Sequence, residues 1–182
     1  MKITLEWLKK YNACEEGVEW FKYQQIEDST EIINHFIKSG KQFDWADWLI
    51  IRLLPQREAV MYEIFKAEKY IGLFKKMYPD NFDPQIAISA AKKWLEDPSK
   101  ENTDFAAAIA DDTYNAYEQA GFTSKTYGDD HSKAADAAFA AYAACDNTNS
   151  SIHHDSAAVY IKGHNTTIEI LEYGLKLTEE KA

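Results

Sequence analysis

The fold is decided by one alanine-rich stretch, Ala134-Ala135-Asp136-Ala137-Ala138-Phe139-Ala140-Ala141-Tyr142-Ala143-Ala144. Alanine is the strongest helix former, so this stretch predicts a helix. Its small side chains also allow neighbouring helices to approach closely. Shorter alanine clusters at 90–91, 106–108 and 157–158 repeat the feature elsewhere in the chain. The pattern therefore predicts tightly packed helices in antiparallel succession.

Apolar residues recur at helical spacing along nearly the whole chain of 182 residues. After a short opening turn at residues 5–8, helices are expected over 14–25, 29–40, 43–54, 56–77, 83–96, 103–121, 134–144 and 155–177. No alternating apolar and polar run is long enough to indicate a sheet. We therefore predict an all-α fold, a multi-helix bundle of about eight helices with short loops.

Specific residues mark where these helices begin and end. Carboxylate or other polar side chains that accept a hydrogen bond at a helix start are expected at Asp28, Asp83 and Asn102 or Thr103. Glycines that end a helix are expected at Gly40 and Gly121.

The chain divides into two parts at Pro55. Residues 1–55 form a tryptophan-rich helical unit, and residues 56–182 form an alanine-rich helical bundle, the two packed as one globular body. Trp45 and Trp48 are three residues apart, so they share a helical face, and we expect both in the core.

Acidic residues are concentrated in the last part of the chain. The formal net charge is −10, and residues 100–182 carry six Lys/Arg against fourteen Asp/Glu, a net −8. A broad phosphate-binding surface needs an excess of cations, so direct binding to nucleic acid is not expected. The acidic excess predicts either a solvated face or a surface complementary to a basic partner. On the second interpretation, the candidate partner-binding residues are Asp111, Asp112, Asp129, Asp130 and Asp136.

No residue pattern indicates a reaction centre. The sequence contains no HExxH, CxxC, glycine-rich phosphate loop or Gly-x-Ser-x-Gly element. His153, His154 and His164 are of a metal-binding residue type, but adjacent histidines point to different sides of a helix. We predict no catalytic residues, no metal and no cofactor, and keep a metal-dependent enzyme built on these histidines as the weakest of three hypotheses.

The cysteines and the apolar runs bear on the compartment. Cys14 and Cys145 lie far apart and form no disulfide framework, which favours a reducing compartment, and both are expected to be small buried residues. No run approaches the ~18 apolar residues of a membrane span. Residues 1–6 do not resemble a signal peptide. We therefore expect a cytoplasmic protein that does not bind a membrane.

Two sets of motifs resemble known proteins. Residues 13–21 and 44–49 resemble a short helical module that recurs in phage and bacterial proteins of unassigned function. The second set comprises Ala67-Glu68, Leu73-Phe74, Tyr78-Pro79-Asp80, Asp83-Pro84, Ala87-Ile88, Ala90-Ala91, Trp94-Leu95, the run 140–144 and Ala157-Ala158-Val159-Tyr160. Over residues of about 57–175 this set is similar to the immunity proteins of bacterial polymorphic toxin systems. That family usually carries arginines beside the proline of this helix start, whereas Phe82-Asp83-Pro84-Gln85 has none.

The resemblance implies a non-enzymatic protein that binds and inhibits a toxin or effector, and this is our leading hypothesis. The alternative is a phage-encoded anti-defence protein whose acidic surface imitates nucleic acid. Both hypotheses predict a protein partner, and neither identifies it or the oligomeric state.

Overall fold

The computed structural model describes residues 1–127, 129–149 and 164–180. Over these residues the chain forms nine α-helices and no strand, apart from one isolated bridge between Lys2 and Asp28. The helices are α1 (Leu5–Lys10), α2 (Glu15–Gln24), α3 (Ser29–Ser39), α4 (Phe43–Leu53), α5 (Gln56–Met77), α6 (Asp83–Glu96), α7 (Lys100–Tyr127), α8 (Asp129–Asn149) and α9 (His164–Glu179). The predicted all-α fold is confirmed. Within the described helices, none has the length and apolar character needed to cross a membrane.

The expected boundaries of α3 are confirmed. Asp28 precedes the helix, and its Oδ1 accepts a hydrogen bond of 3.1 Å from the backbone N–H of Glu31. This bond occupies one of the free N–H groups at the helix start. Gly40 follows the helix with a φ of 67°, a left-handed conformation that glycine adopts without steric cost.

Two other helix starts differ from the prediction. α6 begins at Asp83 itself, whose backbone N–H donates to Oδ1 of Asn81 at 3.0 Å. α7 begins before Asn102 and Thr103, because Oγ of Ser99 accepts a hydrogen bond of 3.4 Å from the N–H of Asn102. In both places a polar side chain slightly upstream takes the role that the prediction gave to a later residue.

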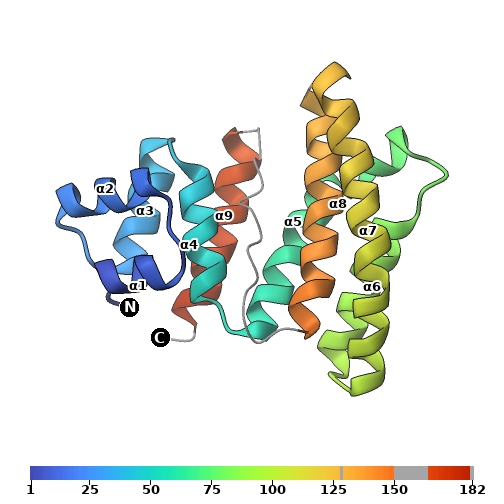
Figure 1. The fold of residues 1–182 in the computed structure, drawn as a ribbon, viewed down its shortest axis with the longest axis horizontal. Helices are drawn as coiled ribbons and strands as arrows, with labels where there is room; N and C mark the ends of the chain where they lie inside the picture. The colour runs from blue at the N-terminus through green and yellow to red at the C-terminus, as the bar shows by residue number, and fades with distance from the viewer. Residues whose placement is uncertain (128, 150–163, 181–182) are drawn as a thin grey trace.

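The helices α7 and α8 form a long antiparallel hairpin, and α8 lies between α7 and α5 (Figure 1). α8 contains the whole stretch 134–144, as predicted. The prediction that Gly121 ends the preceding helix is wrong, because α7 continues to Tyr127. A glycine inside a helix costs only about 1 kcal/mol relative to alanine, and packing against α8 can offset that cost. Many alanines of α7 and α8 are buried: Ala106, Ala110, Ala116, Ala120, Ala134, Ala135, Ala137, Ala138, Ala140, Ala141, Ala143 and Ala144.

The last helix packs on the N-terminal unit. α9 contacts α3, α4 and α5, and it stands beside α4 in Figure 1. Its Ile170, Leu171 and Leu175 belong to one buried cluster with Ile33 of α3 and Ile50 of α4. α5 contributes to this cluster and also to a second one that it shares with α6, α7 and α8. α9 therefore belongs to the core of the N-terminal unit, although it comes last in the chain. A division of the chain at residue 55 separates this helix from that core.

Gly174 allows α9 to approach its neighbours closely. A Cβ atom there would lie 2.6 Å from Cε2 of Tyr62 and 2.7 Å from Cγ2 of Ile50, and both of these side chains are fully buried. Overpacking of this kind costs about 1–3 kcal/mol, which exceeds the ~1 kcal/mol that alanine gains in helix propensity. We expect Gly174→Ala to lower the free energy of unfolding by up to about 2 kcal/mol in urea denaturation.

Gly72 provides the matched control, because it is a helical glycine where an added Cβ atom would meet no other atom within 4 Å. Gly72→Ala should raise the free energy of unfolding by about 0.5–1 kcal/mol. A shift of the same sign in both variants would contradict the close approach at Gly174.

A buried ionic cluster links α4 to α5. Nζ of Lys66 lies 3.0 Å from Oδ2 of Asp47 and 3.2 Å from Oε1 of Glu63. The hydroxyl of Tyr62 donates to Oδ1 of Asp47 at 2.7 Å. Oε2 of Glu63 is buried and has no hydrogen-bond partner among the described residues. The ammonium group of Lys66 therefore forms ion pairs with two buried carboxyl groups.

Burial controls the protonation of this cluster. It raises the pKa of Glu63 to about 7, because the opposing attraction of Lys66 only partly offsets the loss of solvent and Asp47 adds repulsion. Burial alone would lower the pKa of Lys66, but the charges and hydrogen bonds of Asp47 and Glu63 outweigh it and raise that pKa above its ordinary value. Lys66 therefore stays charged at neutral pH, while Glu63 titrates there.

Candidate protein-binding face

Four aromatic side chains meet on one side of the α7–α8 hairpin. The ring centroids of Tyr117 and Phe139 are 4.9 Å apart, and those of Tyr114 and Tyr142 are 5.3 Å apart. The pairs Tyr114–Tyr117 and Phe139–Tyr142 are each 5.7 Å apart. These separations and the inclined ring planes are those of favourable aromatic contacts. Phe139 is buried in a small cluster with Ala143, and Tyr117 and Tyr142 pack against it. We call the four rings the aromatic platform.

The sequence builds this platform by simple helical spacing. Tyr114 and Tyr117 are three residues apart on α7, and Phe139 and Tyr142 are three apart on α8, so each pair lies on one face of its helix. The antiparallel hairpin then brings the two pairs together. Since most other residues of α8 in this region are buried alanines, and Phe139 is buried too, Tyr142 is the large aromatic side chain that remains partly exposed there.

Part of the platform is open to solvent. Tyr114 is 39% exposed, and Tyr117 and Tyr142 are half-buried. Phe122, two helical turns beyond Tyr114, is 77% exposed. The hydroxyl groups of the three tyrosines form no hydrogen bond with the described part of the chain. Their hydrogen-bonding groups are therefore available to a partner.

Carboxyl groups stand at both ends of the platform. Burial raises the pKa of Tyr142, and the charges of Asp146 and Asp111 raise it further, together with Tyr114. Burial also raises the pKa of Tyr117, with further contributions from Tyr114, Asp136 and Glu118.

Asp111 and Asp146 therefore lie near one end, and Glu118 and Asp136 near the other. The four rings, Phe122 and these four acidic residues together form what we call the tyrosine–acid face. Its members are Asp111, Tyr114, Tyr117, Glu118, Phe122, Asp136, Phe139, Tyr142 and Asp146.

The structure brings together two of the five aspartates that the sequence singled out. Asp111 and Asp136 belong to the tyrosine–acid face. Asp112 is exposed, but it is the next residue along α7 and so points about 100° around the helix from Asp111. Oδ1 of Asp130 lies 4.0 Å from Nζ of Lys133, before the face begins on α8. The side chain of Asp129 lies outside the described part of the structure.

Sequence reasoning missed most of this face, notably Tyr114, Tyr142, Glu118 and Asp146. A usable signal was present, since two aromatic pairs at a spacing of three occur on consecutive helices. Recognising it required the register of the hairpin, which neither helix reveals alone.

The histidines proposed for a metal site are not tested by the structure. His153 and His154 lie outside the described residues, and so does the side chain of His164 at the start of α9. Within the described residues, no group of three or more His, Cys, Asp or Glu side chains could hold a metal ion.

The described part of the chain thus defines an all-α protein whose longest hairpin presents aromatic rings between two pairs of carboxyl groups. Comparison of the chain with family models, curated proteins and solved structures finds no match.

Proposed function

We propose that the protein is a non-enzymatic inhibitor of the immunity type, which binds a basic surface of a toxin or effector through the tyrosine–acid face. The observation that supports this most is the joining of partly exposed tyrosines and carboxyl groups on one face. Tyrosine is enriched among the residues that dominate binding energy, because it adds a large contact area and a hydrogen-bonding group.

The charge of the face favours a basic partner. Neither Asp111 nor Glu118 forms an ion pair with the described residues, so both carboxylates can pair with a partner's Lys or Arg. The surrounding chain adds to this field, since residues 100–182 carry a net −8. Such a field speeds association with a basic protein and disfavours acidic ones.

The partner can be identified by cross-linking from the face. A photo-reactive phenylalanine derivative at position 114 should give one discrete cross-linked protein in the native host. The same group at Tyr23, which is 78% exposed on α2, provides the control. The captured protein is then purified for affinity measurements.

The charge-reversal variant Asp111→Lys should weaken binding to that partner about tenfold or more, mainly through slower association. Asp112→Lys is the matched control, because it makes the same charge change one position away on another side of α7. Its affinity should stay within about twofold of the unaltered protein.

Equal effects of Asp111→Lys and Asp112→Lys would contradict a defined binding face. Displacement of the partner by duplex DNA would instead favour the second hypothesis, an anti-defence protein that imitates nucleic acid. An inhibitor of the immunity type should abolish the activity of the captured toxin in a one-to-one complex.

A further inference from the structure

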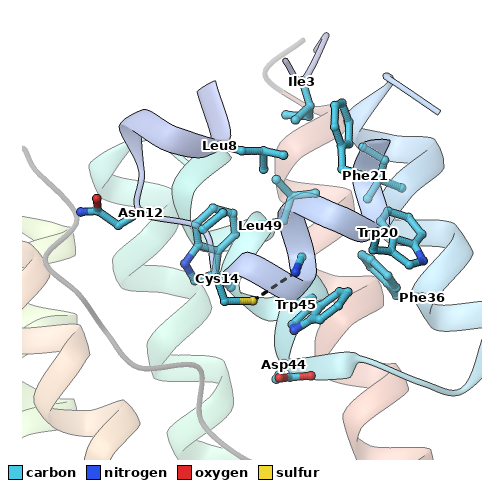
Figure 2. Close-up of a pocket in the computed structure, with 14 residues that line it drawn as sticks. Ile3, Leu8, Asn12, Cys14, Trp20, Phe21, Phe36, Asp44, Trp45 and Leu49 are labelled. Atoms are coloured by element: carbon cyan, nitrogen blue, oxygen red, sulfur yellow. Dashed lines mark hydrogen bonds between the residues drawn. The ribbon is translucent and has the colours of Figure 1, made fainter. Parts of the chain in front are cut away.

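The N-terminal unit contains a partly open cavity of about 240 Å³ (Figure 2). Its walls come from Ile3, which precedes α1, from α1 to α4, and from the segment that joins α1 to α2. Most of the lining is apolar: Ile3, Leu8, Ala13, Gly17, Trp20, Phe21, Ile32, Phe36, Trp45, Trp48 and Leu49. Asn12, Cys14 and Asp44 complete it. Since an apolar cavity of about 150 Å³ suffices to bind benzene, this one has room for a larger aromatic molecule.

Three tryptophans dominate the wall. Trp45 and Trp48, expected in the core, are half-buried, because their rings line the cavity. The ring of Trp20 lies 6.4 Å from that of Trp45 and 4.6 Å from that of Phe36. Tryptophan rings carry negative charge on their faces, so such a wall attracts cations as well as apolar groups.

Asp44 gives the cavity a charged edge. It is half-buried beside Trp45, and it forms no hydrogen bond or ion pair with the described residues (Figure 2). It also lies in the first turn of α4, where the helix dipole stabilises a negative charge. A half-buried carboxylate beside aromatic rings favours a cation as its partner.

The wall formed by α2 is the least embedded in the protein. None of its ten residues is fully buried. Cys14, expected to be buried, is exposed at its start, and Sγ accepts a hydrogen bond of 3.3 Å from the N–H of Gly17. Figure 2 shows this thiol among the residues that line the cavity. The Cys14 thiol can therefore report on occupancy of the cavity.

We propose that this cavity binds a small aromatic molecule that carries an ammonium group. The ring lies among the tryptophans, and the ammonium group pairs with Asp44. A carboxylate ligand is disfavoured because Asp44 would repel it, as would Glu15 and Glu16 in the first turn of α2. This proposal does not depend on the tyrosine–acid face, which belongs to other helices.

Three probes of equal ring size test it by calorimetry: 1-naphthylmethylamine, 1-naphthalenemethanol and 1-naphthoate. We expect the amine to bind at least tenfold more tightly than the alcohol, and the acid to show no measurable binding. In Asp44→Asn the amine and alcohol should bind equally, whereas Asp112→Asn, a carboxylate change far along the chain, should keep the preference. The amine should also slow the reaction of Cys14 with maleimide at least threefold, while Cys145, which is buried, should stay unmodified.

Equal binding of amine and alcohol to the unaltered protein would overturn the role of Asp44, and absence of binding by all three probes would overturn the site. Binding of the amine without protection of Cys14 would place the ligand elsewhere and overturn the proposal as well. Ala13→Met, which fills the cavity, should abolish binding while the helical circular dichroism spectrum is retained. If that variant fails to fold, the Asp44→Asn and maleimide experiments still test the proposed binding site.

Discussion

Replacing Lys66 by methionine is expected to destabilise the protein by about 3–5 kcal/mol at neutral pH. The change removes the ammonium group that lies 3.0 Å from Asp47 and 3.2 Å from Glu63, and methionine preserves much of the side-chain volume. It leaves two buried carboxyl groups without their cation, and desolvation of such groups is costly. Urea denaturation measured by circular dichroism gives the free energy of unfolding.

The exposed pair of Lys92 and Glu68 provides the control, because both side chains are about half exposed. Lys92→Met should change the free energy of unfolding by less than about 1 kcal/mol. If Lys66→Met were no more destabilising than this control, Lys66 would not hold the buried cluster together.

The second large effect is a dependence of stability on pH that originates from Glu63. Its pKa is about 7 in the folded protein, above the ordinary value of 4.5 that applies to the unfolded chain. Between these two values the folded state binds the proton more tightly. The contribution of Glu63 to stability is therefore fully present below about pH 4.5, and it is lost as the pH rises through 7. The two values correspond to a loss of at most about 3 kcal/mol.

Glu63→Gln isolates this contribution, because glutamine keeps the oxygen that accepts from Lys66 but does not titrate. The free energy of unfolding of the variant, taken relative to that of the unaltered protein, should rise by about 1–3 kcal/mol as the pH goes from 5 to 8. Comparing the two proteins at each pH cancels the contributions of the other carboxyl groups to stability. One of these is Asp28, whose lowered pKa makes the protein less stable at low pH. A difference that does not vary with pH would show that Glu63 does not titrate in this range.

The sequence predicted features that depend on neighbouring residues in the chain. The alanine stretch of α8 forms a helix because each residue favours one, whatever surrounds it. Asp28 and Gly40 bound α3 because capping is a contact between residues a few positions apart. The helices and their approximate order were therefore predictable.

Features that depend on which helices pack together were not predictable. The apolar stripe of α9 reveals a buried face, but it does not indicate that Ile50 and Tyr62 lie against Gly174. Likewise, Tyr114 and Tyr142 become one face only through the register of the α7–α8 hairpin. Both outcomes depend on contacts between residues distant in the chain, which local periodicity does not encode.

Trp45 and Trp48 illustrate the same limit for the cavity. Their spacing correctly predicts a shared helical direction, yet it cannot distinguish a filled core from a cavity bounded by α2. Whether the space is filled or left as a cavity depends on how many large side chains α1 and α2 place in it. Those short helices leave the space among the tryptophans open.

The most direct test of the proposed binding face is hydroxyl-radical footprinting of the protein with its captured partner bound. Tyr114 and Phe122 are on the tyrosine–acid face, whereas Tyr23 and Phe82 are exposed on other helices or loops, at 78% and 52%. We expect oxidation of Tyr114 and Phe122 to slow at least threefold in the complex, while the rates at Tyr23 and Phe82 stay unchanged. Protection of Tyr23 or Phe82 with unchanged rates at Tyr114 and Phe122 would contradict it.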